Sequence, residues 1–256
     1  MATNYTPSTP SSLHFVHRLR DRAAYDAPTI HSILDSGLVA HVGFTLPASI
    51  NPTNTPSDDQ ETWPFVIPMA YGRVEDIVYL HGYVSGRMMK ALSRAGDDEQ
   101  AGPPTTITVT HVDSLVLALD PFNNSFNYRS ACVFGHARLV SDEEEKMMAL
   151  KTITDHPFNA SAERGSRWED SKLPTEAEMK TTKVIAVRIK AASAKARRGD
   201  VKDDKKDIED VEGTSGRYWA GVVPVETRFG EARGMEYSKG IEVPGYVKGL
   251  NGRSLN

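Results

Sequence analysis

Residues 66–92, VIPMAYGRVEDIVYLHGYVSGRMMKAL, restrict the possible folds more than any other stretch of the chain. Two strand-like runs, residues 66–73 and 77–81, flank a polar break at 74–76, and this pattern predicts a β-hairpin. The second run leads into the tripeptide Ser-Gly-Arg, after which apolar residues follow at helical spacing. We therefore expect a strand, a turn with Ser85 as the helix N-cap, and then a helix.

The turn between this strand and this helix is a candidate anion site. A helix start leaves several backbone N–H groups without intrahelical partners. Arg87 and Lys90 would add positive charge beside Ser85 and Gly86, and this combination suits a phosphate group. An ordinary solvated helix cap is the alternative interpretation, because every helix start needs its N–H groups satisfied.

Length, charge and cysteine content exclude several classes of protein. A chain of 256 residues can bury a sizeable core, as one large β-domain or two small ones. Its net charge of −4 provides no basic excess for nucleic acid. Cys132 is the single cysteine, which we expect to be a buried thiol, so an intramolecular disulfide and a zinc site with paired cysteines are excluded. With no bilayer-length apolar stretch and no secretory signal pattern, we expect a cytoplasmic protein without a membrane partner.

Three helices are expected around the strands. Asp26 is a natural cap for the first of them. Ser141 and Glu144 have the spacing of a capping box ahead of the acidic and apolar run EEEKMMALKTITDH. Thr175 and Glu178 have the same spacing before a short third helix.

The remaining sequence reads as strands, loops and a tail. Residues 47–63 and 199–216 are polar and lack an apolar period, which predicts loops, and residues 112–113 are expected to form a turn. We divide the chain into a flexible N-terminal segment (1–20), a single domain (21–225) and a C-terminal tail (226–256). The expected strands are residues 38–45, 66–73, 77–81, 105–111, 114–119, 128–140 and 182–195.

Motifs of other enzyme classes are missing from the sequence. It contains no GxSxG nucleophile elbow, no P-loop, no HExxH helix and no GxGxxG opening a helix after a strand. Hydrolase, NTPase, zinc-peptidase and Rossmann functions therefore lack support. The eight histidines are scattered without ligand spacing, so no metal site is expected.

Several segments, in order, resemble one known family. They are PMAY, YLHG and SGR, then TVTHVDSLVLA, then YRSACVFGHARLV, and finally ASAKARRGD and WAGVVP. In this order they are similar to the FMN-binding split β-barrel family of pyridoxamine 5′-phosphate oxidase, and more closely to its flavin-nucleotide-binding and nitroimidazole-resistance branch. The resemblance spans residues 19–224 and implies a mainly β (α+β) protein, a split β-barrel with peripheral helices.

The resemblance also implies a cofactor and a partner. It implies FMN at the interface of a homodimer, with the phosphate at the SGR turn and the ring beside the strands. An aromatic side chain from the partner subunit would cover the ring, which is physically apt for an aromatic group. The candidate cofactor-binding residues are Pro68, Met69, Ala70, Tyr71, His81, Ser85, Gly86, Arg87, Lys90, Tyr128, Arg129, Ser130 and Trp219.

Three functions agree with these features. The first is an FMN-dependent oxidoreductase that reduces a small aromatic acceptor, a nitroreductase or quinone-type reductase, in which the flavin is the redox centre and no side chain need be a general acid or base. The second is a haem-binding split barrel with His81, His111 or His136 as axial ligand. The third is a flavin carrier or sensor. Pyridoxamine 5′-phosphate oxidation is not expected, because the tail reads TRFGEARG and lacks the Arg-x-His segment of that enzyme.

Overall fold

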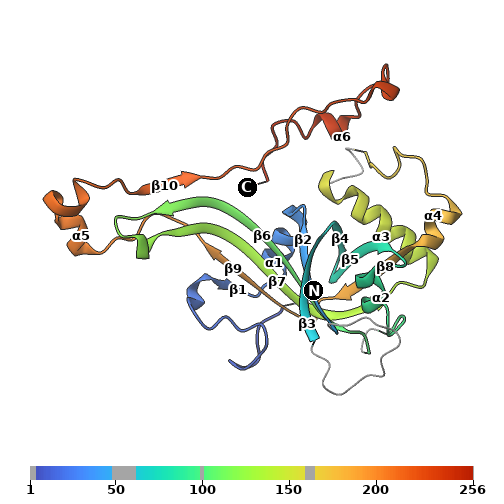
Figure 1. Ribbon diagram of the computed structural model, residues 1–256, viewed down its shortest axis with the longest axis horizontal. Helices are drawn as coiled ribbons and strands as arrows, with labels where there is room; N and C mark the ends of the chain where they lie inside the picture. Colours follow the sequence, from blue (N-terminus) through green and yellow to red (C-terminus); the bar gives the residue numbers. More distant parts are fainter. Residues whose placement is uncertain (1–3, 48–61, 99–100, 159–164, 256) are drawn as a thin grey trace.

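The computed structural model describes residues 4–47, 62–98, 101–158 and 165–255 (Figure 1). Within these residues ten strands form one antiparallel sheet with the order β3-β2-β6-β7-β8-β5-β4 along its main path. This is the expected mainly β split barrel. Its strands are β1 Ala23–Ala24, β2 Ala40–Pro47, β3 Thr62–Met69, β4 Tyr71–Val74, β5 Ile77–Tyr83, β6 Pro104–Leu117, β7 Ser125–Leu139, β8 Thr182–Arg188, β9 Ala191–Arg197 and β10 Gly221–Pro224.

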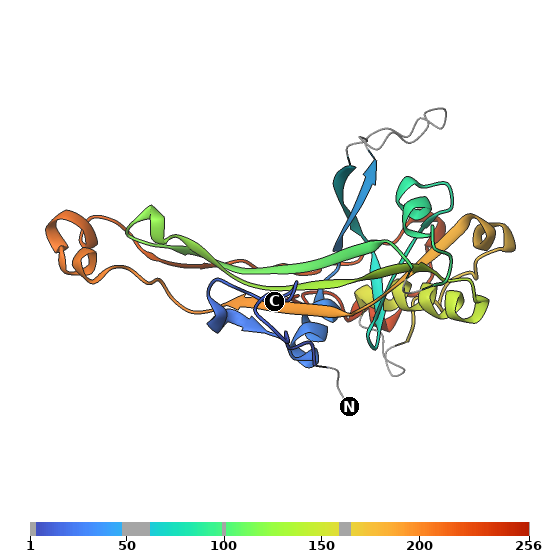
Figure 2. The same ribbon diagram turned by 90° about the horizontal axis from the view of Figure 1, so that it is seen from below.

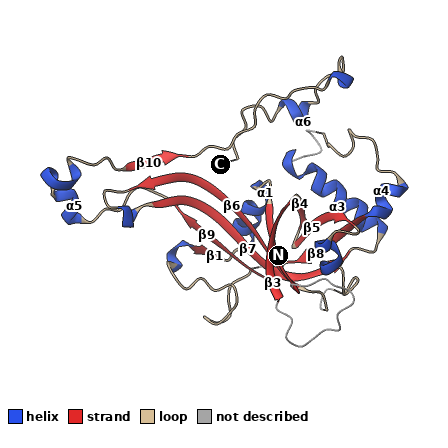
Figure 3. Ribbon diagram, in the orientation of Figure 1, coloured by secondary structure: helices blue, strands red, loops and turns tan. Residues whose placement is uncertain are grey.

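The helices lie at the periphery of this sheet (Figure 3). Helix α1 buries an apolar stripe against the barrel, and α3 packs on the other side of the layer formed by β5 and β8. The 47–63 loop falls mostly outside the described residues. The helices are α1 Ala27–Ser36, α2 Arg87–Leu92, α3 Glu143–Asp155, α4 Glu176–Thr181, α5 Lys205–Glu209 and α6 Gly245–Lys248.

The predicted hairpin of residues 66–73 and 77–81 is only partly correct. The first run divides at Ala70 into β3, which pairs with β2, and β4, which pairs with β5. Strand β3 ends the main path of the sheet and contains Pro64 and Pro68. Prolines cannot donate to a ladder and are tolerated on such edge strands.

Strands β6 and β7 form a long hairpin that extends from the barrel as an arm (Figures 1 and 2). The predicted turn at residues 112–113 is wrong, because β6 runs through it with only a shift in register between Val112 and Ser114. Without a glycine there, one extra residue is absorbed as a bulge and the chain does not reverse. The reversal comes at Pro121–Asn123, a 3₁₀ turn whose first N–H groups are capped by Asp120.

Strand β7 changes partner at Gly135. It pairs with β9 over residues 128–134 and with β8 over residues 137–139. A Cβ atom on Gly135 would lie 2.2 Å from the carbonyl oxygen of Arg188. Glycine therefore permits the close backbone approach at which the two parts of the barrel meet.

The helix starts test the predicted caps. Asp26 caps α1, and Thr175 with Glu178 forms the predicted capping box of α4. The box predicted from Ser141 and Glu144 is wrong, because Asp142 caps α3 by accepting from the Glu145 N–H at 2.7 Å.

Ser85 is not the N-cap of α2 either. Gly86 takes that place, and no side chain caps this helix. A Cβ atom on Gly86 would come within 2.9 Å of the Tyr83 carbonyl oxygen, to which the Gly86 N–H donates. The tight turn thus needs glycine where the side-chain pattern pointed to serine.

Both terminal segments contact the domain. Tyr5 is buried, and its hydroxyl donates to Asp76 at 2.5 Å, so the N-terminal segment has a defined path from residue 4 onward. In the tail, Tyr246 is buried and its hydroxyl donates to Asp170 at 3.0 Å. Among the described residues no helix is long and apolar enough to span a membrane.

Candidate functional site

Strand alternation gives the sheet of β3, β2, β6, β7 and β9 two different faces. The inner face carries the apolar core. The outer face carries half-buried or exposed side chains, many of them small or polar, with larger apolar ones at Val66 and Phe134. One row of them runs in register across all five strands: Pro68, His41, Thr108, Cys132 and Ser193.

The side chains of this outer row are exposed or half-buried, so a ligand can reach them. Ser130 lies on the same face, one outward position further along β7, and its hydroxyl donates to the Lys195 carbonyl at 3.2 Å. Cys132 is half-buried here, not fully buried as expected, and partial burial raises the pKa of its thiol to about 11.

The start of α2 lies beside β3. The Arg87 guanidinium lies 4.7 Å from the centre of the Phe65 ring, a cation–π contact between the helix and the strand. Lys90 is exposed on the same short helix, and no side chain caps its first turn. The helix has only six residues, so its dipole is small. The two cationic side chains and the N–H groups without a side-chain cap are what favour an anion here.

Four of the candidate residues share the outer side of the sheet. Pro68 lies on β3, Ala70 directly follows that strand, and Tyr128 and Ser130 lie on β7. All four occupy outward positions. The Ser85–Arg87 turn reaches the same strand through the Arg87–Phe65 contact. Phe65 packs with Ile67 and Met69 against the core on the inner face, so the predicted phosphate turn and these four residues meet β3 from opposite faces.

Three other candidates point elsewhere. Met69 packs against the core on the inner face. Tyr71 is buried, and its hydroxyl donates to the carbonyl oxygens of Leu34 and Gly37. Arg129 lies on the side of α1 and pairs with Asp113 at 2.9 Å. Alternation along β7 places Arg129 and Ser130 on opposite faces, so they do not serve one ring together.

Trp219 lies two residues before β10, which pairs with β6 along the arm. Its side chain is 66% exposed, and Phe122 at the tip of the arm is 98% exposed. Large exposed aromatic side chains of this kind are typical of surfaces that meet a partner. Trp219 is therefore exposed enough to cover a ring that is bound to a partner subunit.

His81 lines a separate cavity under α3. The cavity measures about 360 Å³, and its other walls include Leu150, Trp168, Leu173 and Met179. The Nδ1 atom of His81 is buried and has no hydrogen-bond partner among the described residues. Burial lowers the pKa of His81, so its imidazole is neutral near pH 7.

The other two histidines proposed as axial ligands are engaged. The Nε2 atom of His111 lies 3.1 Å from the Ser36 hydroxyl. The Nδ1 atom of His136 lies 2.9 Å from the Lys190 amine. Of the three, His81 alone combines a buried nitrogen without a partner with a cavity. Sequence reasoning missed the walls of this cavity, since Trp168 and Leu173 lie in a loop that no motif marks.

No cluster of three or more His, Cys, Asp or Glu side chains arranged to hold a metal ion occurs in the described part of the chain. The site therefore consists of an outer sheet face, a cationic helix start and a histidine-lined cavity. All three lie on a split β-barrel, and this fold defines the class of protein.

The match to known sequences identifies the family. Residues 26–196 match the sequence profile of the pyridoxamine 5′-phosphate oxidase family. The chain therefore belongs to this family. A search of curated proteins gave no significant match.

Two solved structures resemble the chain over nearly its whole length. The flavocytochrome Anf3 from Azotobacter vinelandii is 29% identical with a TM-score of 0.74, and the alignment covers 96% of this chain and 99% of that one. The FAD and haem binding protein from Mycobacterium smegmatis is 25% identical with a TM-score of 0.72, covering 92% of this chain and 99% of that one. Both names describe proteins with a flavin and a haem.

Proposed function

We propose that this protein is a flavin-dependent oxidoreductase that reduces a small aromatic acceptor, such as a nitroaromatic compound or a quinone. The observation that carries the proposal is the cationic start of α2, which has no side-chain cap, in a chain of this family. Such a helix start suits the phosphate of a flavin nucleotide. A flavin supplies the electron transfer when bound, and the chain supplies position and polarity.

Different residues would hold the phosphate and the ring of a flavin. Arg87 and Lys90, with the uncapped N–H groups after Gly86, would hold the phosphate through charge-assisted hydrogen bonds. Pro68 and Ser130 would lie against the ring from the outer face. No carboxylate or imidazole on this row is needed as a general acid or base.

A homodimer would complete this site. The outer face is open in one chain, and the exposed Trp219 lies on an arm that extends away from its own barrel (Figure 2). A second copy would bring that tryptophan over the ring and exclude water from it. The proposal thus has the flavin between two subunits.

The flavin itself is predicted to be FMN, whereas one similar solved structure is named for FAD. Denaturing the purified protein and identifying the released flavin by mass spectrometry decides between them. Consumption of NADH or NADPH with a nitroaromatic or quinone acceptor then tests turnover. A protein that stays colourless after incubation with FMN and FAD would contradict the proposal, and a flavin without turnover would leave a carrier or sensor.

A second candidate function is a flavocytochrome, in which the chain also binds haem. The specific observation is the neutral His81, whose buried Nδ1 has no partner among the described residues, at a cavity of about 360 Å³ lined by both apolar and polar side chains. An imidazole nitrogen is a common axial ligand of haem iron, and Lys172 in the same wall has a charge that suits a carboxylate. These residues fit a haem, which would supply one-electron chemistry to the flavin.

The haem candidate has a direct test. We expect His81→Ala to remove the haem absorbance of protein reconstituted with haem, while the flavin content stays unchanged. His136→Ala is the matched control, because that ring bonds Lys190 and should leave haem binding intact. Equal haem binding by His81→Ala and the wild type would exclude His81 as the ligand.

A further inference from the structure

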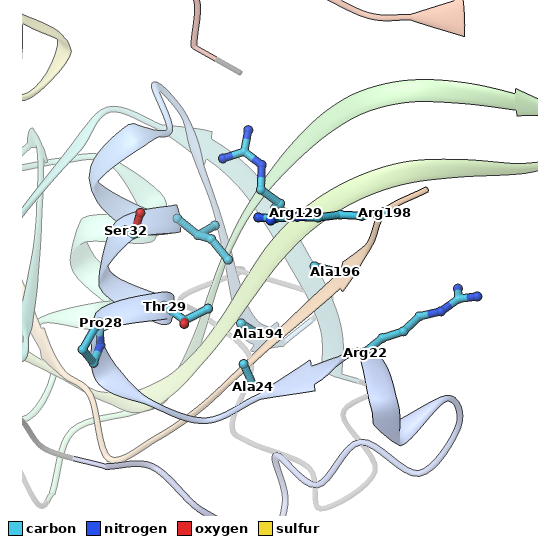
Figure 4. A pocket seen from close by; sticks show the side chains of 10 residues that line it. Arg22, Ala24, Pro28, Thr29, Ser32, Arg129, Ala194, Ala196 and Arg198 are labelled. Carbon is cyan, nitrogen blue, oxygen red and sulfur yellow. The ribbon is translucent and has the colours of Figure 1, made fainter. Parts of the chain in front are cut away.

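A second cavity, apart from that of His81, lies between α1 and the strands β7 and β9, on the side of the sheet opposite to the outer row (Figure 4). It measures about 370 Å³. Three arginines line it, each from a different segment: Arg22, Arg129 and Arg198. Its floor is made of alanines that leave the space open, namely Ala24, Ala194 and Ala196.

The pairing of β1 with β9 creates this cationic cavity. Ala23 pairs with Lys195, and Ala24 pairs with Ala194. Two basic stretches far apart in the sequence, HRLRDR at 17–22 and AKARR at 194–198, thereby lie side by side. In a chain with a net charge of −4, such a concentration of arginine is a local feature and not a result of composition.

The arginines at and beside the cavity differ in whether their side chains have a partner. Arg129 is neutralised by Asp113, and the neighbouring Arg197 is buried and donates to the side chain of Asn127. The guanidinium groups of Arg22 and Arg198 have neither an ion pair nor a hydrogen bond to any described residue. Figure 4 shows Arg198 reaching along the cavity toward Arg129, whereas the Arg22 side chain points away from both. Arg198 therefore offers a guanidinium group inside the cavity, and Arg22 offers a second one at its rim.

The first turn of α1 does not itself make the anion site. The Thr29 N–H is already bonded to the Asp26 carboxylate at 2.9 Å. One turn further along, the Ser32 hydroxyl faces the same cavity and has no hydrogen-bond partner among the described residues. The available donors are thus two guanidinium groups and one hydroxyl.

We propose that this cavity binds the diphosphate group of an adenine nucleotide. Guanidinium groups match phosphate oxygens with paired N–H donors, and a serine hydroxyl adds a third donor. The volume falls in the range of roughly 300–1,000 Å³ that small-molecule pockets occupy, and the alanine floor leaves space for a sugar beyond the phosphates. The site lies across the sheet from the proposed flavin face, so its existence does not depend on the proposed function.

ADP is the probe, because FAD and the pyridine dinucleotides share its diphosphate. We expect isothermal titration of the full-length protein with ADP to show saturable binding of one ADP per chain. Arg198→Gln and Arg22→Gln should each weaken it at least tenfold, and Arg198→Lys should retain part of it. Arg233→Gln, an exposed arginine in the tail, removes the same charge elsewhere and should leave ADP binding unchanged.

Two further measurements identify the nucleotide to which the diphosphate belongs. If it belongs to FAD, ADP competes with FAD and Arg198→Gln loses FAD, and the flavin phosphate then lies in this cavity and not at the Arg87 turn. If it belongs to a pyridine nucleotide, Arg198→Gln keeps its flavin and its KM for NADH or NADPH rises. Absence of ADP binding, or ADP binding that the Arg22→Gln and Arg198→Gln variants leave unchanged, would overturn the proposal. Circular dichroism melts should match the wild type, since neither side chain has a partner to lose.

Discussion

Replacing Arg87 by alanine tests the phosphate end of the proposed flavin site. The guanidinium lies at the start of α2, beside β3, and its one described contact is with the Phe65 ring at 4.7 Å. The side chain is exposed. Its removal therefore takes away the nearest positive charge to the uncapped N–H groups and leaves the packed methionines of α2 in place.

The expected loss of flavin affinity follows from the contacts that the Arg87 guanidinium can make. A hydrogen bond to a charged group contributes about 1.5–3 kcal/mol, so Arg87→Ala should weaken flavin binding by roughly 10- to 150-fold. The cation–π contact with Phe65 is worth about 0.5–1 kcal/mol at an exposed site, which limits the loss of stability to that range. Flavin affinity should thus fall far more than the free energy of unfolding.

Quenching of flavin fluorescence on titration with the apoprotein measures the affinity, and urea unfolding measures the stability. Arg87→Lys keeps the charge and should recover part of the affinity. Arg94→Ala removes an exposed arginine from the loop after the same helix and is the matched control. Flavin retention by Arg87→Ala equal to that of the wild type would refute the assignment of the phosphate to this turn.

Two further predictions concern the frame around the site. Tyr71→Phe should lower the free energy of unfolding by about 1–3 kcal/mol, because the buried Leu34 carbonyl loses its hydroxyl donor, while the Gly37 carbonyl keeps His156 as a partner. Tyr83→Phe, at an exposed tyrosine, is the control, and equal urea midpoints for the two variants would contradict the reasoning. Burial lowers the pKa of His156, so the unfolded chain binds more protons and the stability should fall as the pH drops below about 6.5. Unfolding at a series of pH values should show this slope reduced in His156→Gln, and an unchanged slope would exclude His156 as its source.

Local patterns predicted the elements that depend on local chemistry. Helix α1 begins after Asp26 and ends at Gly37, where the cap and the apolar stripe placed it. The capping box of Thr175 and Glu178 is present for the same reason. The prediction for α3 missed by one residue, because Ser141 and Asp142 are both able to cap and packing of the helix selects the second.

Features that depend on long-range pairing were less predictable. The division of residues 66–73 into β3 and β4 reflects the choice of two different partner strands, which no local signal contains. Alternation along β7 does predict that Arg129 and Ser130 face opposite sides, but helix α1 decides which side becomes the core. The placement of Arg22 and Arg198 around one cavity follows from the β1–β9 pair, and the two residues are too distant in sequence for a motif to join them.

Native mass spectrometry of the purified protein, incubated with FMN and with FAD, tests the central claim most directly. We expect a mass of two chains with two bound flavins, and loss of the flavins from Arg87→Ala under the same conditions. A single chain without flavin after both incubations would contradict a site built on the outer sheet face and closed by a second subunit.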